Sequence, residues 1–261
     1  MNKCLFAIGI TLSLFTLVGC GGTKVLKESK PLQITQPLGV ASDQQNTATL
    51  DWIIIRDGPG TWAKNADWDE YLLRVSNQSG QPITLTRIIV VDSLDTQISP
   101  EQGRKQLVKS SKQTSRRYKD SGIKVKAGRG AGTMLVAGAA VTAVGVGAAA
   151  ATAYGTAMAG TAAGTAGAAA GGLLLLGPAL AVGGIVRGVN NSKVNKEIEL
   201  RQTTLPVEIP AGEEIRLNIF FPIAPSPKRV ELGYADTAGE HTLIIDTSVA
   251  LDGLHIDTNA D

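Results

Sequence analysis

A long block without charged side chains interrupts this chain. From Gly130 to Val186 there is no Asp, Glu, Lys, Arg or His, and 34 of these 57 residues are Gly or Ala. As a helix in water, its 14 glycines would cost more than about 10 kcal/mol relative to alanine. A solvated linker is also disfavoured, because the block carries large apolar side chains such as Leu173 to Leu176. In hydrocarbon every backbone amide must be paired within the protein, and helices then become the favoured structure.

The block is long enough for two membrane-spanning helices joined as a hairpin. Residues 131–153 and 165–186 would each be about 33–35 Å long as helices. Glycines four residues apart let helix backbones approach closely, and four such pairs occur: Gly128 and Gly132, Gly160 and Gly164, Gly167 and Gly171, and Gly184 and Gly188. In composition and spacing the segment resembles the glycine-zipper regions of bacterial outer-membrane proteins, which implies helices that pack through these glycines. We therefore expect a helical hairpin over residues 130–188, inserted in the membrane or packed on a protein surface.

The first twenty residues predict export from the cytoplasm. A short positive start at Lys3 precedes an apolar run from Leu5 to Leu17 that is too short to span a bilayer comfortably. The run ends in Leu17-Val18-Gly19-Cys20, which resembles the lipobox of bacterial lipoproteins. The resemblance implies that residues 1–19 are a signal peptide and that Cys20 is acylated as the new N-terminus. Acyl chains, at about 0.8 kcal/mol per buried methylene, would make this attachment effectively permanent.

Cysteine usage agrees with a lipoprotein. The chain has two cysteines, and Cys4 lies in the part that would be removed. Acylation of Cys20 would leave neither a disulfide nor a free thiol in an oxidising compartment. Gly21 follows the cysteine in place of Asp, which in enteric-type lipoproteins implies transport to the outer membrane. We expect a protein of the bacterial cell envelope, lipid-anchored in the outer membrane and either periplasm-facing or surface-exposed.

Short apolar runs separated by turn residues predict β strands on both sides of the charge-free block. Residues 49–98 contain three such runs and residues 198–251 contain four. Seven short strands in about 100 residues are typical of an immunoglobulin-like sandwich. The expected fold is mainly β, a seven-stranded immunoglobulin-like sandwich split by the inserted Gly/Ala-rich α-helical hairpin. Two separate small β domains are the alternative, although three strands alone would bury little core.

The remaining segments are polar. Residues 20–48 are expected to form a flexible tether, and residues 252–261 a tail. Residues 99–129 form a basic connector with ten Lys or Arg after residue 100 against only Glu101 and Asp120. A helix is expected there, with Ser99 as its N-cap and Pro100 in its first turn. Two interpretations stay open: a solvated or disordered connector, and a surface that contacts anionic lipid headgroups.

Residues that could carry chemistry are few. His241 and His255 have no second ligand at metal-binding spacing, and no catalytic or nucleotide-binding motif is present. Asp67, Asp69 and Glu70 form an acidic cluster flanked by Trp62, Trp68 and Tyr71. The cluster could be a calcium or ligand site, but a packed aromatic corner with solvated acids is favoured. We expect no catalytic residue, no metal and no cofactor, and a net charge of +2 does not indicate nucleic acid as a partner.

These observations favour a non-catalytic lipoprotein that is held at the membrane by its lipid and its hairpin. Its sandwich would bind or scaffold a protein partner in the envelope. Two alternatives remain: an oligomer, formed by self-association, whose glycine-zipper helices line a pore or perturb the bilayer, and an accessory subunit of an export or surface-assembly complex.

Overall fold

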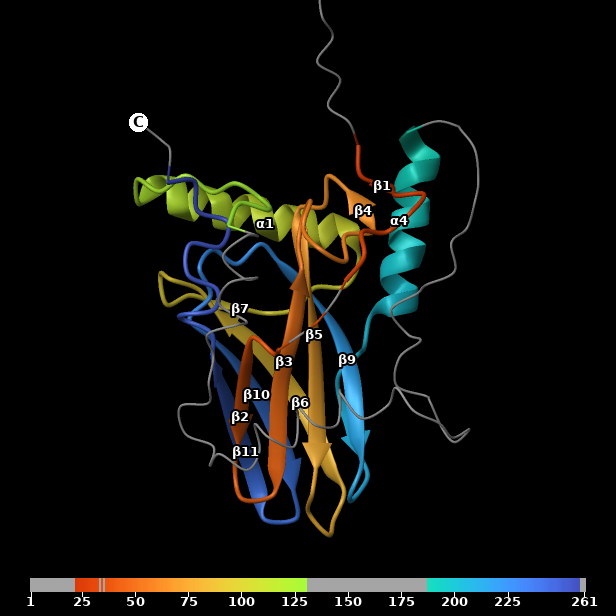
Figure 1. Ribbon diagram of the computed structural model, residues 1–261, viewed down its shortest axis with the longest axis vertical. Coiled ribbons are helices and arrows are strands. Elements are labelled where there is room, and N and C mark those ends of the chain that lie inside the picture. The colour runs from red at the N-terminus through yellow and green to blue at the C-terminus, as the bar shows by residue number, and fades with distance from the viewer. Residues whose placement is uncertain (1–21, 33, 35, 131–186, 259–261) are drawn as a thin grey trace, which may run out of the picture.

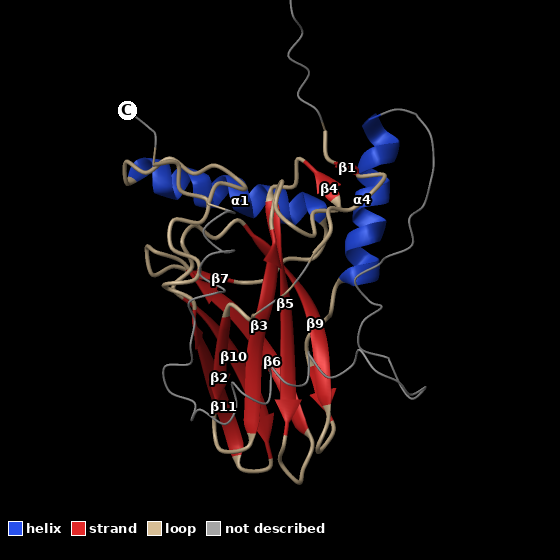
Figure 2. Ribbon diagram, viewed as in Figure 1, coloured by secondary structure: helices blue, strands red, loops and turns tan. Residues whose placement is uncertain are grey.

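The computed structural model describes residues 22–32, 34, 36–130 and 187–258. Within these residues the protein is mainly β and built from antiparallel sheets, which confirms the predicted fold class at that level (Figures 1 and 2). Cys20 and most of the expected hairpin lie outside the described residues, and so do Gly132, Gly160, Gly164, Gly167, Gly171 and Gly184.

Two larger sheets contain nearly all the strands. The first has the order β2 (Gly39–Ser42), β3 (Asn46–Ile54), β5 (Trp68–Asn77) and β9 (Glu214–Pro222). The second has the order β11 (Gly239–Asp246), β10 (Arg229–Asp236), β6 (Ile83–Val91) and β7 (Gln97–Ile98), and β8 (Val207–Ile209) also pairs with β6. A third, two-stranded sheet joins β1 (Lys24–Val25) to β4 (Ala63–Lys64).

Side-chain alternation is clear in β11 of the second sheet, whereas β5 of the first sheet is buried on both faces from Trp68 to Leu73. In β11, Leu243 and Ile245 are buried, whereas the intervening Ile244 is 53% exposed, because successive side chains on a strand point to opposite faces. Both large sheets contribute to one hydrophobic core, with Leu50 and Leu73 from the first and Ile88 from the second. The sheets therefore form a sandwich-like pair of layers with a shared interior.

The two halves of the chain, before and after the charge-free block, are interleaved. Strand β9 pairs with β5 over the whole register from Trp68–Pro222 to Ser76–Glu214. Strand β10 pairs in the same way with β6 in the other sheet. Each of the two large sheets contains strands from both halves, so the block is an insertion within one fold and the alternative of two separate β domains is wrong.

The segment expected to be a tether belongs to the fold instead. Strand β2 pairs with β3, strand β1 pairs with β4, and Leu38 is fully buried. The polar run that suggested a linker is the turn between β2 and β3. There the Asp43 carboxylate accepts hydrogen bonds from the backbone N–H groups of Gln45 and Asn46, as Asp commonly does in turns.

Two helices flank the insertion: α1 (Arg104–Asp120) before it and α4 (Arg187–Arg201) after it. The second half of the sandwich was predicted to begin at residue 198, but residues 198–201 belong to α4. Val194 and Ile198 lie four residues apart on this helix, and both are buried. In the described part of the chain no helix has both the length and the apolar character needed to cross a membrane.

Helix α1 begins later than expected. Its N-cap is Gly103, not Ser99. The preceding residues still belong to the sheets, since β7 pairs with β6 and the Glu101 N–H donates to the Phe220 carbonyl. These contacts keep the chain from Gln97 to Glu101 on the sheets, and the helix begins after them.

The expected tail is also folded as far as the structure describes it. Leu254 and His255 are fully buried, and Ile256 forms a β-bridge with Val125. The segment around Val125, which leads into the insertion, is therefore attached to the C-terminal segment.

Candidate functional site

The helices and the small sheet gather at one end of the sandwich. In Figure 1, β1, β4, α1 and α4 lie together beyond the strand ends, and the turn between β10 and β11 lies at the opposite end. We call the first end the helical end. Helix α4 contacts both β1 and α1, and the Arg104 N–H of α1 donates to the Asn195 side chain of α4 at 3.3 Å.

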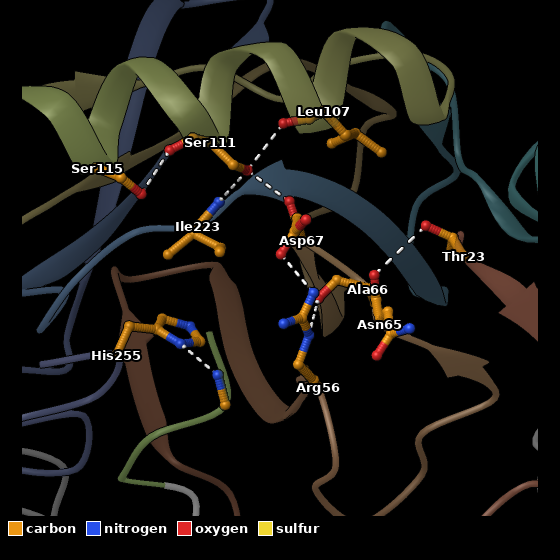
Figure 3. A network of polar contacts seen from close by, with 11 residues as sticks. Thr23, Arg56, Asn65, Ala66, Asp67, Leu107, Ser111, Ser115, Ile223 and His255 are labelled. Atoms are coloured by element: carbon orange, nitrogen blue, oxygen red, sulfur yellow. Dashed lines mark hydrogen bonds and ion pairs between the residues drawn. The ribbon is translucent and has the colours of Figure 1, made fainter. Parts of the chain in front are cut away.

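Helix α1 packs on the sheets through one face. Its buried residues, Leu107, Ser111, Thr114 and Tyr118, follow the spacing of one side of a helix. The Ser111 hydroxyl joins the helix to two other segments: it lies 2.5 Å from the Asp67 carbonyl and accepts a hydrogen bond from the Ile223 N–H at 2.9 Å (Figure 3). The interpretation of this segment as a disordered or solvated connector is therefore wrong.

The far end of α1 is fixed by two further contacts. The Tyr118 hydroxyl lies 2.8 Å from the Ser93 hydroxyl, and burial raises the Tyr118 pKa to about 12. The adjacent Arg117 pairs with the fully buried Asp92 carboxylate at 2.7 Å. These contacts fix the rotation of the helix about its axis.

The opposite face of α1 is basic. At about 100° per residue, five of its cationic side chains fall within an arc of about 80°, opposite the buried face: Lys105, Lys109, Lys112, Arg116 and Lys119. All five are exposed, and none forms an ion pair within the part of the chain that the structure describes. We call these residues the basic stripe.

The acidic cluster does not form a metal site. Asp67 pairs with Arg56, Asp69 with His255, and Glu70 with Trp62, so the three carboxylates are directed to different partners. Among the described residues no group of three or more His, Cys, Asp or Glu could hold a metal ion. The expectation of solvated acids is also wrong for two of them, since Asp69 is 0% and Glu70 is 1% exposed.

Glu70 connects α4 to the first sheet. Its two carboxylate oxygens accept hydrogen bonds from the Trp62 indole N–H at 2.7 Å and the Asn218 amide at 2.8 Å. Arg201, near the end of α4, lies 4.0 Å from the same carboxylate and 5.0 Å from the centre of the Trp62 ring. Burial raises the Glu70 pKa, and Arg201 partly opposes that shift by favouring the charged form.

The raised pKa gives stability a defined pH dependence. Native Glu70 holds its proton more tightly than the unfolded chain does, with its ordinary pKa of 4.5. The stability contributed by this titration is fully present below that value and is lost as pH rises through the folded pKa. The free energies of unfolding of wild type and Glu70→Gln can be measured with denaturant between about pH 4 and pH 7. The free energy of unfolding of wild type is expected to fall relative to that of Glu70→Gln as pH rises.

The Arg201→Met variant is the control for this prediction. Without the guanidinium the Glu70 pKa is expected to rise further and the pH dependence to extend to higher pH. A free energy of unfolding of wild type that rises with pH relative to Glu70→Gln would contradict the raised pKa of Glu70.

His255 connects the C-terminal segment to β5 and to the start of the insertion. Its Nδ1 accepts a hydrogen bond from the Gly128 N–H at 3.0 Å, and its Nε2 lies 2.9 Å from Asp69 Oδ2. Because a backbone N–H can only donate, Nδ1 carries no proton and Nε2 donates to the carboxylate. All three groups belong to one buried contact, which we call the His255 contact.

Two of the glycines expected in helix packing lie in the described residues. Gly128 is not in a helix: it lies in a turn with φ of 80°, and a Cβ there would be 2.3 Å from the Arg56 carbonyl oxygen. Its small size serves the packing of this turn, so the proposed pairing of Gly128 with Gly132 in a helix is wrong. Gly188 lies within α4.

The sequence did not reveal the His255 contact or α4. Asp69 and His255 are 186 residues apart, and nothing near either residue indicates the other. The buried face of α1 was detectable in principle, because its four buried residues have helical spacing. It was missed because two of them, Ser111 and Thr114, are polar and were not counted as buried.

Comparisons with known proteins add no assignment. No family model matches the chain, and neither the curated proteins nor the solved structures contain a match to it.

Proposed function

We propose that the protein is a non-catalytic, lipid-anchored protein of the bacterial cell envelope whose helical end faces the membrane. The Gly/Ala-rich insertion enters the membrane or packs at its surface, and the sandwich extends away to bind or scaffold a protein partner. We assign the sandwich to the immunoglobulin-like class, with β3, β5, β6 and β8 to β11 as its seven strands and β2 as an additional edge strand.

The observation that carries the proposal is the short length of chain between Cys20 and the first residues of the fold. Gly22 is the first described residue, and Thr23, directly before β1, is buried, with its hydroxyl 3.4 Å from the Asn65 carbonyl. Two residues of chain reach at most about 7 Å in any conformation. An acyl group on Cys20 would therefore bring the helical end against the lipid, without the spacer that a flexible tether would have provided.

The insertion supports the same orientation. Helix α1 precedes it, α4 follows it, and the two helices contact each other at the helical end. A membrane-active segment that leaves and re-enters the fold between these helices acts at the end that carries the lipid. The sheets and the turns at the opposite end are then left accessible to a partner.

The non-catalytic assignment has its own support. Among the described residues, the groups that the sequence singled out as candidates for chemistry form structural contacts: His255 with Asp69, Glu70 with Trp62 and Asn218. Both histidines and the acidic cluster are accounted for in this way, since His241 pairs with Asp236 at the edge of the sandwich.

The Cys20→Ser variant tests the anchor. It is expected to lose labelling by a palmitate analogue in cells and to retain residues 1–19, because the acylated thiol is required for both modification and cleavage at a lipobox. Intact-mass measurement and envelope fractionation on a density gradient follow the two outcomes. Wild type is expected in the outer-membrane fraction.

The matched control is Cys4→Ser, which removes the other cysteine of the chain. It is expected to be labelled, cleaved and localised like wild type. Continued labelling of Cys20→Ser, or equal loss in Cys4→Ser, would show that Cys20 is not the acylated residue.

A further inference from the structure

The basic stripe is an exposed line of positive charge at the helical end. Its five cationic side chains extend along the helix from Lys105 to Lys119, a length of about 21 Å. A depression of about 360 Å³ follows the same helix, and five of its seven lining residues are Lys or Arg. The positive charge is thus concentrated on one exposed line along the helix.

The fold fixes the direction in which the stripe points. Leu107, Ser111 and Tyr118 hold the opposite face of α1 against the sheets, and Figure 3 shows Ser111 directed from the helix into the sandwich. The basic stripe therefore points away from the sheets. It shares the helical end with β1, which begins two residues after Gly22.

The residue types indicate what this surface binds. Four of the five cations are Lys, a flexible point charge, and only Arg116 has the planar group that suits bidentate recognition. A line of point charges about 21 Å long exceeds any single phosphate ion. It matches a plane of many headgroups, each of which can meet one side chain.

We infer that the basic stripe binds the phosphate-bearing headgroups of anionic lipids in the leaflet that holds the N-terminal acyl group. This inference rests on the proposed function for its orientation. It adds the partner of α1 and a second, electrostatic attachment beside the lipid. Basic side chains near a surface of anionic lipid contribute about 1 kcal/mol each to membrane binding.

The test uses the full-length chain carrying Cys20→Ser, so that no acyl group masks headgroup binding. Purified protein is incubated with phosphatidylcholine vesicles with or without phosphatidylglycerol, and binding is measured by co-flotation over a range of salt concentrations. We expect a preference for the vesicles containing phosphatidylglycerol that falls as salt rises, because exposed charges are screened.

Charge reversal locates the binding surface. Lys109→Glu is expected to reduce affinity for the anionic vesicles roughly 10-fold or more, and Lys105→Glu/Lys109→Glu/Lys112→Glu on the order of 100-fold or more. Arg87→Glu is the matched control for the single change. Arg87 is exposed on β6 in the body of the sandwich, and its reversal changes the net charge by the same amount as Lys109→Glu. The control is expected to bind like the parent chain.

Three results would overturn the inference. Equal binding to both kinds of vesicle would show that insertion alone attaches the chain, and equal loss in Arg87→Glu would show that only net charge matters. Displacement by inorganic phosphate, but not by chloride at the same ionic strength, would identify a phosphate-ion site in place of a membrane surface. Failure of the lipid anchor would be detected separately, as absence of palmitate labelling in the chain that retains Cys20.

Discussion

Replacement of Asp69 by alanine is expected to lower the free energy of unfolding by about 1–3 kcal/mol. The carboxylate is fully buried and is the partner of His255 Nε2. Its removal leaves an imidazole N–H without an acceptor in a water-excluded site, and a buried donor without a partner bears its full desolvation penalty. Such a loss is a large fraction of the stability of a typical domain, and denaturant unfolding monitored by circular dichroism measures it.

Two variants isolate the buried contact. Asp69→Asn keeps the side-chain volume and an oxygen acceptor for the His255 N–H, so its cost is expected to be clearly smaller than that of Asp69→Ala. Lys228→Ala removes an exposed ion pair with Asp95 and is expected to cost less than about 1 kcal/mol. If Asp69→Ala were no more destabilising than Lys228→Ala, the His255 contact would not contribute to the stability of the fold.

The strands of the core were the most predictable part of this fold. The runs around Leu50, Leu73 and Leu232 combine apolar residues with bounding turn residues, and each became a long strand. That pattern is visible locally, because a short apolar run bounded by turn residues is typical of a buried strand. The position of the insertion between the strands was also visible, since the charge-free composition changes abruptly at Gly130 and at Arg187.

Elements whose stability depends on distant contacts were missed. Strand β2 spans four residues, Gly39–Ser42, too few to show a period, and it exists because β3 supplies its hydrogen-bond partners. Among the side chains of α4 that the structure describes, from residue 191 onward, only Val194 and Ile198 are fully buried and apolar, so its sequence resembles that of a polar linker. In both cases tertiary packing determines the structure and local propensity contributes little.

The candidate site was only partly predictable for the same reason. The cationic residues of 101–129 were evident in the sequence, but their arrangement on one face depends on which side of α1 is buried. Ser111 and Thr114 lie on that buried side, and the burial of Ser111 is compensated by hydrogen bonds of its hydroxyl with Ile223 and Asp67. A pattern based on apolar residues alone does not detect such a face.

Substitution of Gly128 by alanine is expected to cost about 3 kcal/mol or more, because two effects combine at this position. The residue has φ of 80°, where a side chain is strained, and the added Cβ would lie 2.3 Å from the Arg56 carbonyl oxygen. The backbone must then shift, and the hydrogen bond from the Gly128 N–H to His255 is lost with it. Thermal and denaturant unfolding of the full chain give the size of the effect.

Gly122 provides a matched control for the steric part of this effect. Its φ is 77°, close to that of Gly128, but no atom lies within 4 Å of an added Cβ. Gly122→Ala therefore carries only the backbone strain, on the order of 1 kcal/mol, and the difference between the two variants measures the contact with Arg56. Because Gly128 and Asp69 act on the same imidazole, their losses are expected to be less than additive when combined. A Gly128→Ala variant as stable as Gly122→Ala would contradict this role of Gly128, which lies two residues before the start of the charge-free insertion.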